Sequence, residues 1–313
     1  MAKEVELKVD FAGVELSSPV FTVSGTCGYA DELAEFMGVG ALGGFITKTI
    51  TLKPRDGNAP PRIVETDAGM LNAIGLANIG LEAFIADKIS ALAQMSASVF
   101  VSVAGETAGE YAEIVERLAG EEAIDGFELN ISCPNVAQGG LNFGTDAAKV
   151  AEITSAASKC VGTKVLMVKL SPCVTDIAEP ARAAVENGAT ALSLVNTFTG
   201  LAIDVESGRC VLGNGTGGLS GPAIKPMALY LVNKVYRQVA RDYKIPILGI
   251  GGIRTAQDAL EFIISGASAV GVGTASFIEP DCSIKIIDGI QRYCLEKDIA
   301  DISELTGTLE GLR

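Results

Sequence analysis

The feature that most constrains the fold is the alternation of short apolar runs with helix-like stretches along the whole chain. Eight runs have the length and β-branched content of buried strands: Pro19–Ser24, Gly44–Thr49, Val99–Ala104, Gly126–Ser132, Lys164–Leu170, Ala191–Asn196, Ile245–Gly251 and Ala269–Thr274. Helix-like stretches lie between them, at Leu81–Met95, Tyr111–Leu118, Asp146–Lys159, Asp176–Asn187, Pro226–Arg241, Ala256–Ile264 and Pro280–Leu295. Strands that alternate with helices predict an α/β protein of parallel βαβ units. Eight continuous apolar strands favour a closed (β/α)8 TIM barrel over an open sheet.

The chain has the length of one such barrel, 313 residues, and no linker or shift in composition divides it. We therefore expect a single domain over residues 1–313. Two connections are too long for plain turns, from Ile50 to about Gly80 after the second strand and from Thr197 to Gly221 after the sixth. Both follow the C-terminal end of a strand, so we expect structureless binding loops or lids on the catalytic face.

Composition excludes several classes of protein. The net charge of −14 argues against nucleic acid and against anionic membrane surfaces. The segment Met1–Asp10 has no apolar signal core, and no run is long enough to span a bilayer. The seven cysteines are scattered without a CxxC pair, which fits a reducing cytoplasm in which most are small buried hydrophobes. We therefore expect a soluble cytoplasmic protein that holds any anionic ligand with a few local cations.

Cys133 is the sharpest candidate for chemistry. It follows an apolar strand directly and starts a glycine-containing loop, and Asn130 and Asn135 flank it. The chain has no histidine, so proton transfer falls to Cys, Lys, Asp, Glu or Tyr. Cysteines in proteins are most often small buried hydrophobic residues, and we expect this role for most of the other six cysteines. We interpret Cys133 as an acid/base or nucleophile. Without histidine or clustered cysteine, no metal is implied.

The last two strands end in glycine pairs or a glycine–threonine step, Gly251-Gly252 and Gly273-Thr274. Each is followed by residues that can open a helix, Arg254-Thr255 and Ala275-Ser276. Such glycines could merely relieve crowding in turns. Two sets at these two strands favour a phosphate site, because glycine lets the backbone approach a ligand and helix N-termini bind phosphate. The Gly217–Pro222 segment is weaker evidence, since it could be a hinge or a backbone surface against a flat cofactor.

Two lysines and several asparagines fall at the expected barrel mouth. Lys48 and Lys169 each end an apolar strand, where a lysine usually snorkels outward but can also hold an anionic ligand. Taken singly, loop asparagines usually satisfy turns. Together, the carboxamides predict a ligand rich in donors and acceptors, such as a planar imide or pyrimidine ring; they are Asn72, Asn130, Asn135 and Asn196.

These segments, in this order, resemble the class 1 dihydroorotate dehydrogenases essentially from end to end. The resemblance rests on Asn130–Asn135, Thr47–Thr49, Asn72–Leu76, Val168-Lys169, Gly218–Gly221, Gly249–Gly252 and Gly271–Thr274. It implies an FMN-containing (β/α)8 barrel that oxidises (S)-dihydroorotate to orotate in pyrimidine synthesis. Cys133 would then be the base that removes the C5 proton, while the C6 hydrogen leaves as hydride to flavin N5.

The resemblance also assigns binding roles. Lys48 would pair with the substrate carboxylate and lie near the flavin, and Lys169 would sit by the flavin N1/O2 edge and favour the anionic reduced ring. The substrate ring would be surrounded by Asn72, Ala73, Ile74, Gly75, Leu76, Asn130, Asn135, Asn196 and Thr197. The FMN would contact Ser24, Thr49, Ser102, Asn130, Val195 and Gly221, with its phosphate on Gly251, Gly252, Gly273 and Thr274. Ser102 stands where asparagine is expected beside the flavin.

Within the family, Asn72–Leu76 and Ser24–Gly28 resemble the NAD-linked (1B) branch. That branch pairs a homodimeric FMN barrel with a second subunit carrying FAD and a 2Fe–2S cluster, giving a heterotetramer. This chain offers no cluster ligands, so the iron–sulfur centre would belong to the partner. Alternatives are the fumarate-linked branch, a related FMN barrel acting on another dihydropyrimidine, a flavin-free phosphate-binding barrel, and a non-catalytic electron-transfer subunit.

Overall fold

The computed structural model describes residues 5–29, 39–131 and 143–311. Cys133 and Asn135 therefore lie outside the described residues, and the predictions about them rest on sequence alone.

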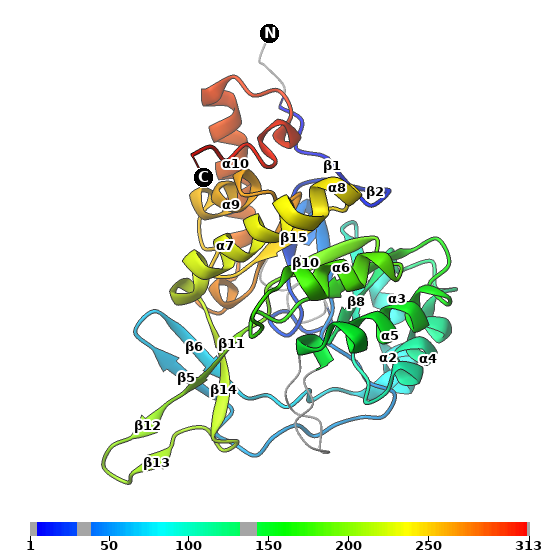
Figure 1. Cartoon of the computed structure of the whole chain (residues 1–313), viewed down its shortest axis with the longest axis vertical. Helices are drawn as coiled ribbons and strands as arrows, with labels where there is room; N and C mark the ends of the chain where they lie inside the picture. Colours follow the sequence, from blue (N-terminus) through cyan, green and yellow to red (C-terminus); the bar gives the residue numbers. More distant parts are fainter. Residues whose placement is uncertain (1–4, 30–38, 132–142, 312–313) are drawn as a thin grey trace.

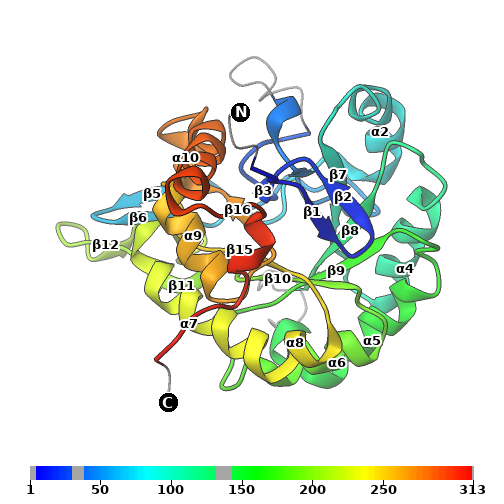
Figure 2. The same cartoon turned by 90° about the horizontal axis from the view of Figure 1, so that it is seen from above.

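Eight parallel strands close into a barrel, as the sequence predicted (Figures 1 and 2). In chain order they are β3 (Val20–Thr22), β4 (Gly44–Ile46), β7 (Ser98–Val103), β8 (Gly126–Asn130), β9 (Val165–Lys169), β10 (Ala191–Leu194), β15 (Ile247–Ile250) and β16 (Ala269–Val272). Each strand pairs with the next along the chain, and β16 closes the ring by pairing with β3. Seven of the eight predicted runs contain a whole barrel strand. The third run, Val99–Ala104, contains all of β7 except its first residue, Ser98. The strands are almost wholly buried, which is why they read as continuous apolar runs.

The helices form the outer ring of the barrel (Figure 2). They are α2 (Gly80–Asp87), α3 (Ile89–Leu92), α4 (Ala108–Leu118), α5 (Ala147–Ser158), α6 (Ala178–Glu186), α7 (Lys225–Val235), α8 (Arg241–Tyr243), α9 (Ala256–Ile264) and α10 (Cys282–Lys297). The stretch predicted as one helix at 81–95 is divided between α2 and α3. The stretch predicted at 226–241 runs from α7 into α8 through a π-helical turn, η4 (Tyr236–Ala240).

The N-terminal end of the barrel is closed by a hairpin of β1 (Val9–Phe11) and β2 (Val14–Leu16). Phe11 packs inside the barrel against Phe21 and Phe100, with ring centroids 5.6 and 6.2 Å away. Because aromatic and aliphatic side chains fill this end, the barrel is a packed core and not a pore. A ligand can therefore enter only from the opposite, C-terminal end.

The two long connections are not structureless, so that part of the prediction is wrong. The first contains β5 (Ile63–Thr66) and β6 (Gly69–Asn72), and the second contains β11 (Phe198–Leu201) and β14 (Thr216–Ser220). They form one antiparallel sheet in the order β11-β14-β6-β5, which lies at the opposite end of the barrel from the β1–β2 hairpin (Figure 1). These strands are glycine-rich or short, and the decisive pairing joins β6 to a strand about 150 residues away. Local pattern cannot reveal such a partner.

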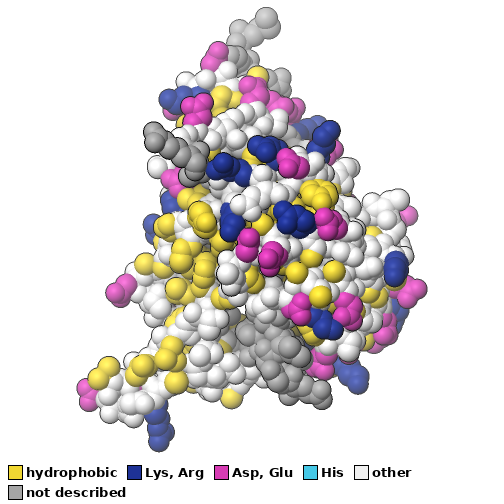
Figure 3. Space-filling view, in the orientation of Figure 1, with side chains coloured by type: hydrophobic (Ala, Val, Ile, Leu, Met, Phe, Trp, Pro, Cys, Tyr) yellow, Lys and Arg dark blue, Asp and Glu magenta, His cyan; other side chains and the backbone are white. Residues whose placement is uncertain are grey.

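Between β11 and β14 the second connection projects as a hairpin of β12 (Ile203–Asp204) and β13 (Arg209–Cys210). Hydrophobic side chains are exposed along this hairpin (Figure 3), with Ile203 60% and Val205 85% exposed. Among the described residues, no helix is long and apolar enough to cross a membrane.

The prediction that most cysteines are small buried hydrophobes holds for only half of the six described. Cys27, Cys282 and Cys294 are buried, whereas Cys173 and Cys210 are exposed. Burial raises the pKa of the Cys282 and Cys294 thiols, which keeps them in the unreactive thiol form. Cys210 lies in β13 on the second long connection, and Cys173 lies in the loop after β9.

Candidate active site

A cavity of about 660 Å³ opens at the C-terminal ends of the barrel strands, between the strand ends and the four-stranded sheet. This volume is in the range of cofactor and small-molecule sites. Residues from both long connections line it together with residues from the ends of β3, β9, β10, β15 and β16. The expectation that both connections belong to the binding face is therefore supported by the position of the cavity.

The cavity brings together nearly all of the predicted site residues that the structure describes. Those lining it are Ser24, Lys48, Thr49, Asn72, Ala73, Ile74, Gly75, Leu76, Asn130, Lys169, Val195, Asn196, Thr197, Gly221, Gly251, Gly252, Gly273 and Thr274. They come from segments as far apart as residues 24 and 274. The barrel and the four-stranded sheet together make them neighbours.

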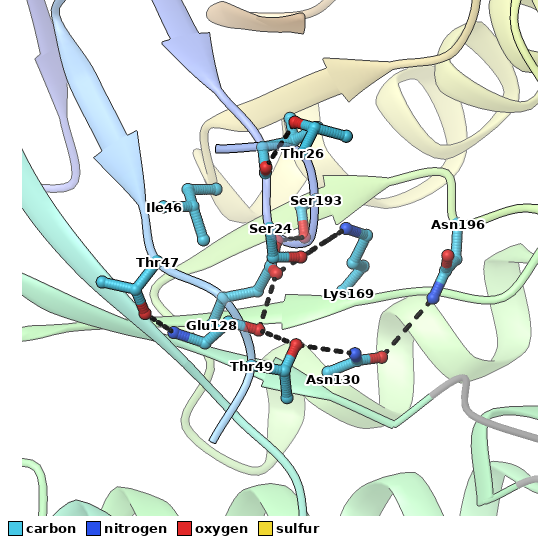
Figure 4. A network of polar contacts seen from close by, with 12 residues as sticks. Ser24, Thr26, Ile46, Thr47, Thr49, Glu128, Asn130, Lys169, Ser193 and Asn196 are labelled. Atoms are coloured by element: carbon cyan, nitrogen blue, oxygen red, sulfur yellow. Dashed lines mark hydrogen bonds and ion pairs between the residues drawn. The ribbon is translucent and has the colours of Figure 1, made fainter. Parts of the chain in front are cut away.

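Beneath the cavity lies a buried polar network (Figure 4). The Lys169 ammonium lies 3.1 Å from Ser24 Oγ and 3.7 Å from Glu128 Oε1. The side chains of Lys169 and Glu128 are 6% and 0% exposed. Lys169 ends β9 and reaches the cavity edge, whereas Glu128 lies within β8 and does not line the cavity. Lys169 therefore does not extend outward into solvent, as a lysine at the end of a strand usually does, but is buried.

A chain of side-chain hydrogen bonds crosses the same region. Asn130 Nδ2 donates to Thr49 Oγ1 at 3.2 Å, and Asn196 Nδ2 donates to Asn130 Oδ1 at 3.4 Å. Tyr111 Oη donates to the carbonyl of Asn130 at 2.9 Å, which fixes the end of β8. The carboxamides therefore sit in defined orientations, which suits recognition of a planar ring with both donors and acceptors.

The first connection contributes Asn72 from the end of β6 and the turn that follows it. Asn72 Nδ2 donates to the carbonyl of Gly218 at 3.3 Å, so this side chain also ties the two connections together. Lys48, after β4, lines the cavity as a second cation. By contrast Asn78 accepts from the N–H groups of Thr51 and Gly80, the turn-satisfying role that loop asparagines usually have.

At the other end of the cavity the lining includes glycines, together with residues such as Arg254 and Phe277. Gly221 (φ +93°) and Gly252 (φ +74°) adopt backbone conformations that favour glycine, and a Cβ on Gly252 would lie 2.7 Å from the carbonyl oxygen of Gly221. Thr274 Oγ1 donates to Ser220 Oγ at 2.8 Å beside them. This end has the form of a main-chain cradle for a compact anion such as phosphate.

The helix N-terminus next to this cradle is already capped. Thr255 caps α9, and the Asp258 carboxylate accepts from the N–H groups of Arg254 and Thr255 at 3.0 and 2.9 Å. Burial pushes the pKa of Asp258 up, but the hydrogen bonds from Lys225 and from the Arg254 N–H outweigh it and lower the pKa. The predicted helix opening is present, but these two N–H groups are taken. A phosphate would thus rest on the glycine segments themselves.

After β16, Ala275 and Ser276 were predicted to open a helix, and they lie in a short 3-10 helix, η5 (Thr274–Phe277). Ser102, predicted beside the flavin, is fully buried and does not line the cavity. Its hydroxyl lies 2.9 Å from Thr49 Oγ1 and donates to Glu128 at 3.1 Å. It supports residues of the site from below.

Sequence reasoning missed several residues of this region. Glu128 could have been noticed as a lone charge inside an apolar strand. Ser193, which donates to Glu128 Oε2 at 3.1 Å, carries no such signal. Met70 and Cys173 also line the cavity and were missed.

Comparison with known proteins identifies the family. A model of the dihydroorotate dehydrogenase family matches residues 6–294. The chain belongs to this family. It is 52% identical over 305 residues to the dihydroorotate dehydrogenase B (NAD(+)) catalytic subunit of Pelobacter propionicus, covering 97% of this chain and 99% of that protein. The corresponding protein of Trichlorobacter lovleyi is 51% identical over 305 residues with the same coverage.

A solved DHODH from Eimeria tenella, in complex with ferulenol, has a similar fold, with a TM-score of 0.79 at 25% identity over 97% of this chain and 88% of that one. The resemblance found in the motifs is confirmed. Membership in the dihydroorotate dehydrogenase family also agrees with a closed eight-stranded barrel whose cavity lies at the strands' C-terminal ends.

Proposed function

We propose that this chain oxidises (S)-dihydroorotate to orotate in pyrimidine synthesis, as the catalytic subunit of an NAD-linked enzyme. The observation that carries the proposal is the two-ended cavity. One end presents oriented carboxamides and two lysines, and the other is a main-chain cradle. The names of the relatives from Pelobacter propionicus and Trichlorobacter lovleyi support the same activity.

The residues present fit FMN, with residues 1–313 acting as one FMN-binding domain. The cradle at Gly221, Gly252 and Thr274 would hold the phosphate, and Lys169 would face the polar edge of the ring system. Ser24, Thr49 and Val195 also line the cavity. When bound, FMN would accept the hydride that leaves C6 of the substrate.

The protein's own contribution is to orient the substrate and to accept a proton. Lys48 supplies a positive charge for the substrate carboxylate, and Asn72, Asn130 and Asn196 offer donors and acceptors to the pyrimidine ring. Cys133 would take the C5 proton, which leaves the two ring carbons joined by a double bond once the hydride has departed. The fully packed opposite end of the barrel keeps bulk water from reaching the site from below.

We further propose that electrons leave for NAD+ through a second subunit carrying FAD and a 2Fe–2S cluster, around a homodimeric core. The phrase "catalytic subunit" in the relatives' names supports a partner. The exposed apolar side chains of Ile203 and Val205 provide surface of the kind that association covers.

The test is an anaerobic titration of the purified protein with dihydroorotate while the visible flavin spectrum is followed. Stoichiometric bleaching of a yellow protein supports the cofactor and the substrate together. Recovery of the colour with NAD+ only after the partner subunit is added supports the NAD-linked branch. A yellow protein bleached by dihydrouracil and not by dihydroorotate would overturn the substrate, and a colourless one that cannot be reconstituted with FMN would overturn the cofactor.

A further inference from the structure

Glu128 is a carboxylate buried completely inside the barrel wall. Its side chain is 0% exposed, and it lies in the middle of β8 between Phe127 and Leu129, which are also fully buried. Burying a charge in such surroundings is costly unless it is paired and hydrogen-bonded. A residue that only filled space here would be apolar, as its neighbours along the strand are.

Both carboxylate oxygens are engaged. Oε1 accepts from Ser102 Oγ at 3.1 Å and lies 3.7 Å from the ammonium of Lys169, while Oε2 accepts from Ser193 Oγ at 3.1 Å. The two serines come from β7 and β10, so the carboxylate is held from both sides of β8 and β9. Figure 4 shows the Glu128 carboxylate directed toward Ser24, Ser193 and the Lys169 ammonium.

Of Glu128 and its three partners Ser102, Ser193 and Lys169, it is Lys169 that lines the cavity. Ser24 holds its ammonium from one side at 3.1 Å, and Glu128 supplies the opposite charge from below. Glu128 does not line the cavity and so cannot touch a ligand there. Of the side chains that it contacts, Lys169 is the charged one that lines the cavity, so we expect Glu128 to act on a bound group mainly through Lys169.

We propose that Glu128 is a positioning residue that fixes the Lys169 ammonium at the cavity edge and partly offsets its charge, and that it thereby sets the reduction potential of the bound flavin. This inference rests on the proposed function. A cation at that edge stabilises the negative charge of the reduced ring system, and a carboxylate behind the cation weakens that stabilisation. The reduction potential is therefore a property of the pair and not of Lys169 alone.

The decisive variant is Glu128→Gln, which keeps the size of the side chain and an acceptor for the serines but removes the charge. We expect the midpoint potential of the flavin to become more positive, equivalent to roughly a tenfold rise in the ratio of reduced to oxidised flavin at a fixed solution potential. Ser193→Ala is the matched control, because it removes one hydrogen bond from the same carboxylate without altering charge. Its potential is expected to stay at the wild-type value.

The potential is measured anaerobically against a reference dye by visible spectroscopy on FMN-loaded protein. A purely structural role predicts equal small shifts in Glu128→Gln and Ser193→Ala, and that result would overturn the proposal. Should Glu128→Gln fail to fold, Glu128→Asp is measured in its place. This variant keeps the charge but retracts it from Lys169, so we expect a smaller positive shift, and an unchanged potential would overturn the proposal.

A second experiment needs no cofactor. Thermal unfolding of the apoprotein is compared for Glu128→Gln, Lys169→Met and the double variant. If the two charges form a pair, each single change removes the partner charge of the other residue, and the double variant loses less stability than the two singles together. Additive losses would overturn the pairing. A wild-type protein that takes up no FMN would instead refute the proposed function, while this cycle still reports on the pair.

Discussion

The two ends of the cavity are lined by different kinds of groups. At the end formed by β8, β9 and β10, polar side chains line the cavity. A network of hydrogen bonds and one buried ion pair holds Asn130, Asn196 and Lys169 in place. At the end formed after β14, β15 and β16, the backbone of Gly221 and Gly252 provides the surface. Side chains can distinguish one ring from another, whereas a main-chain cradle recognises only a compact anion.

The difference predicts a division of labour. Substitutions at the side-chain end should change chemistry more than they change cofactor affinity. Substitutions at the main-chain end should weaken the cofactor's attachment. The predictions below test this division, beginning with the largest expected effect.

Cys133→Ser should remove most turnover near neutral pH, by a factor of about 10² or more, because a serine hydroxyl is a far weaker base than a thiolate. FMN content and orotate binding should be retained, since the change replaces one small side chain with another of similar size. Steady-state kinetics and orotate titration of the flavin spectrum measure the two effects.

Near-normal turnover in Cys133→Ser would remove the cysteine from the mechanism. For the wild type, a thiol with an ordinary pKa of about 8.5 predicts activity that rises toward alkaline pH. A flat profile between neutral and alkaline pH would mean that another group is the base, or that its surroundings lower the thiol pKa.

Gly252→Ala should weaken FMN binding by about 5- to 150-fold, because strain of about 1–3 kcal/mol falls on the main-chain cradle. The new Cβ would lie 2.7 Å from the Gly221 carbonyl oxygen in a backbone with φ +74°. Fluorescence titration of the apoprotein with FMN measures the affinity.

Gly162→Ala is the matched control, since Gly162 has φ +66° but its Cβ would meet nothing within 4 Å. It carries similar backbone strain far from the cavity and should leave FMN affinity unchanged. Equal losses in the two variants would show that the effect is general strain and not the cradle.

Ser102→Ala should reduce the free energy of unfolding by about 1–2 kcal/mol, because it removes a buried donor to Glu128 and a partner of Thr49. FMN affinity should change by less than about threefold, since Ser102 does not line the cavity. Ser193→Ala, equally buried and bound to the same carboxylate, is the comparison. A selective loss of FMN affinity in Ser102→Ala alone would place this serine against the cofactor.

Asp258→Asn should lower the melting temperature by about 2–4 °C at neutral pH, corresponding to about 1 kcal/mol for the weakened helix cap and the lost ion pair. The pKa of Asp258 is lowered in the folded protein, so its stabilisation is present above the unfolded pKa and is lost as the pH falls through the folded pKa. The difference between variant and wild type should therefore shrink in acid. The exposed helical Asp288→Asn serves as the control, and an equal acid dependence there would refute the assignment.

Much of this organisation could be predicted from the sequence because it follows from local pattern. The eight strands read as apolar runs since parallel barrel strands are buried on both faces. The lysines, Asn130 and the two glycine sites followed from their positions at strand ends, whereas Ser24, Thr49 and Val195 came only from the resemblance to the family. These signals need no knowledge of distant contacts.

What could not be predicted depends on pairing across the chain. The β6–β14 ladder joins segments with weak strand character, and Ser193 becomes significant only because β10 lies close enough for it to reach Glu128. The capping of α9 by Asp258 turns a predicted phosphate-binding terminus into an occupied one. In each case the deciding partner is remote or competes for the same N–H group, so no local window contains the answer.

The β6–β14 ladder has a consequence for how this protein can be altered. Asn72 stands opposite Gly218 in the ladder and also donates to the Gly218 carbonyl, so the two long connections share one register over the cavity. A chimera that imports only one connection from a relative would bring strands that no longer match residue for residue. Substrate preference should therefore be exchangeable between family members only when both connections are transplanted together. The two connections form one structural unit, although they lie at two separate places in the sequence.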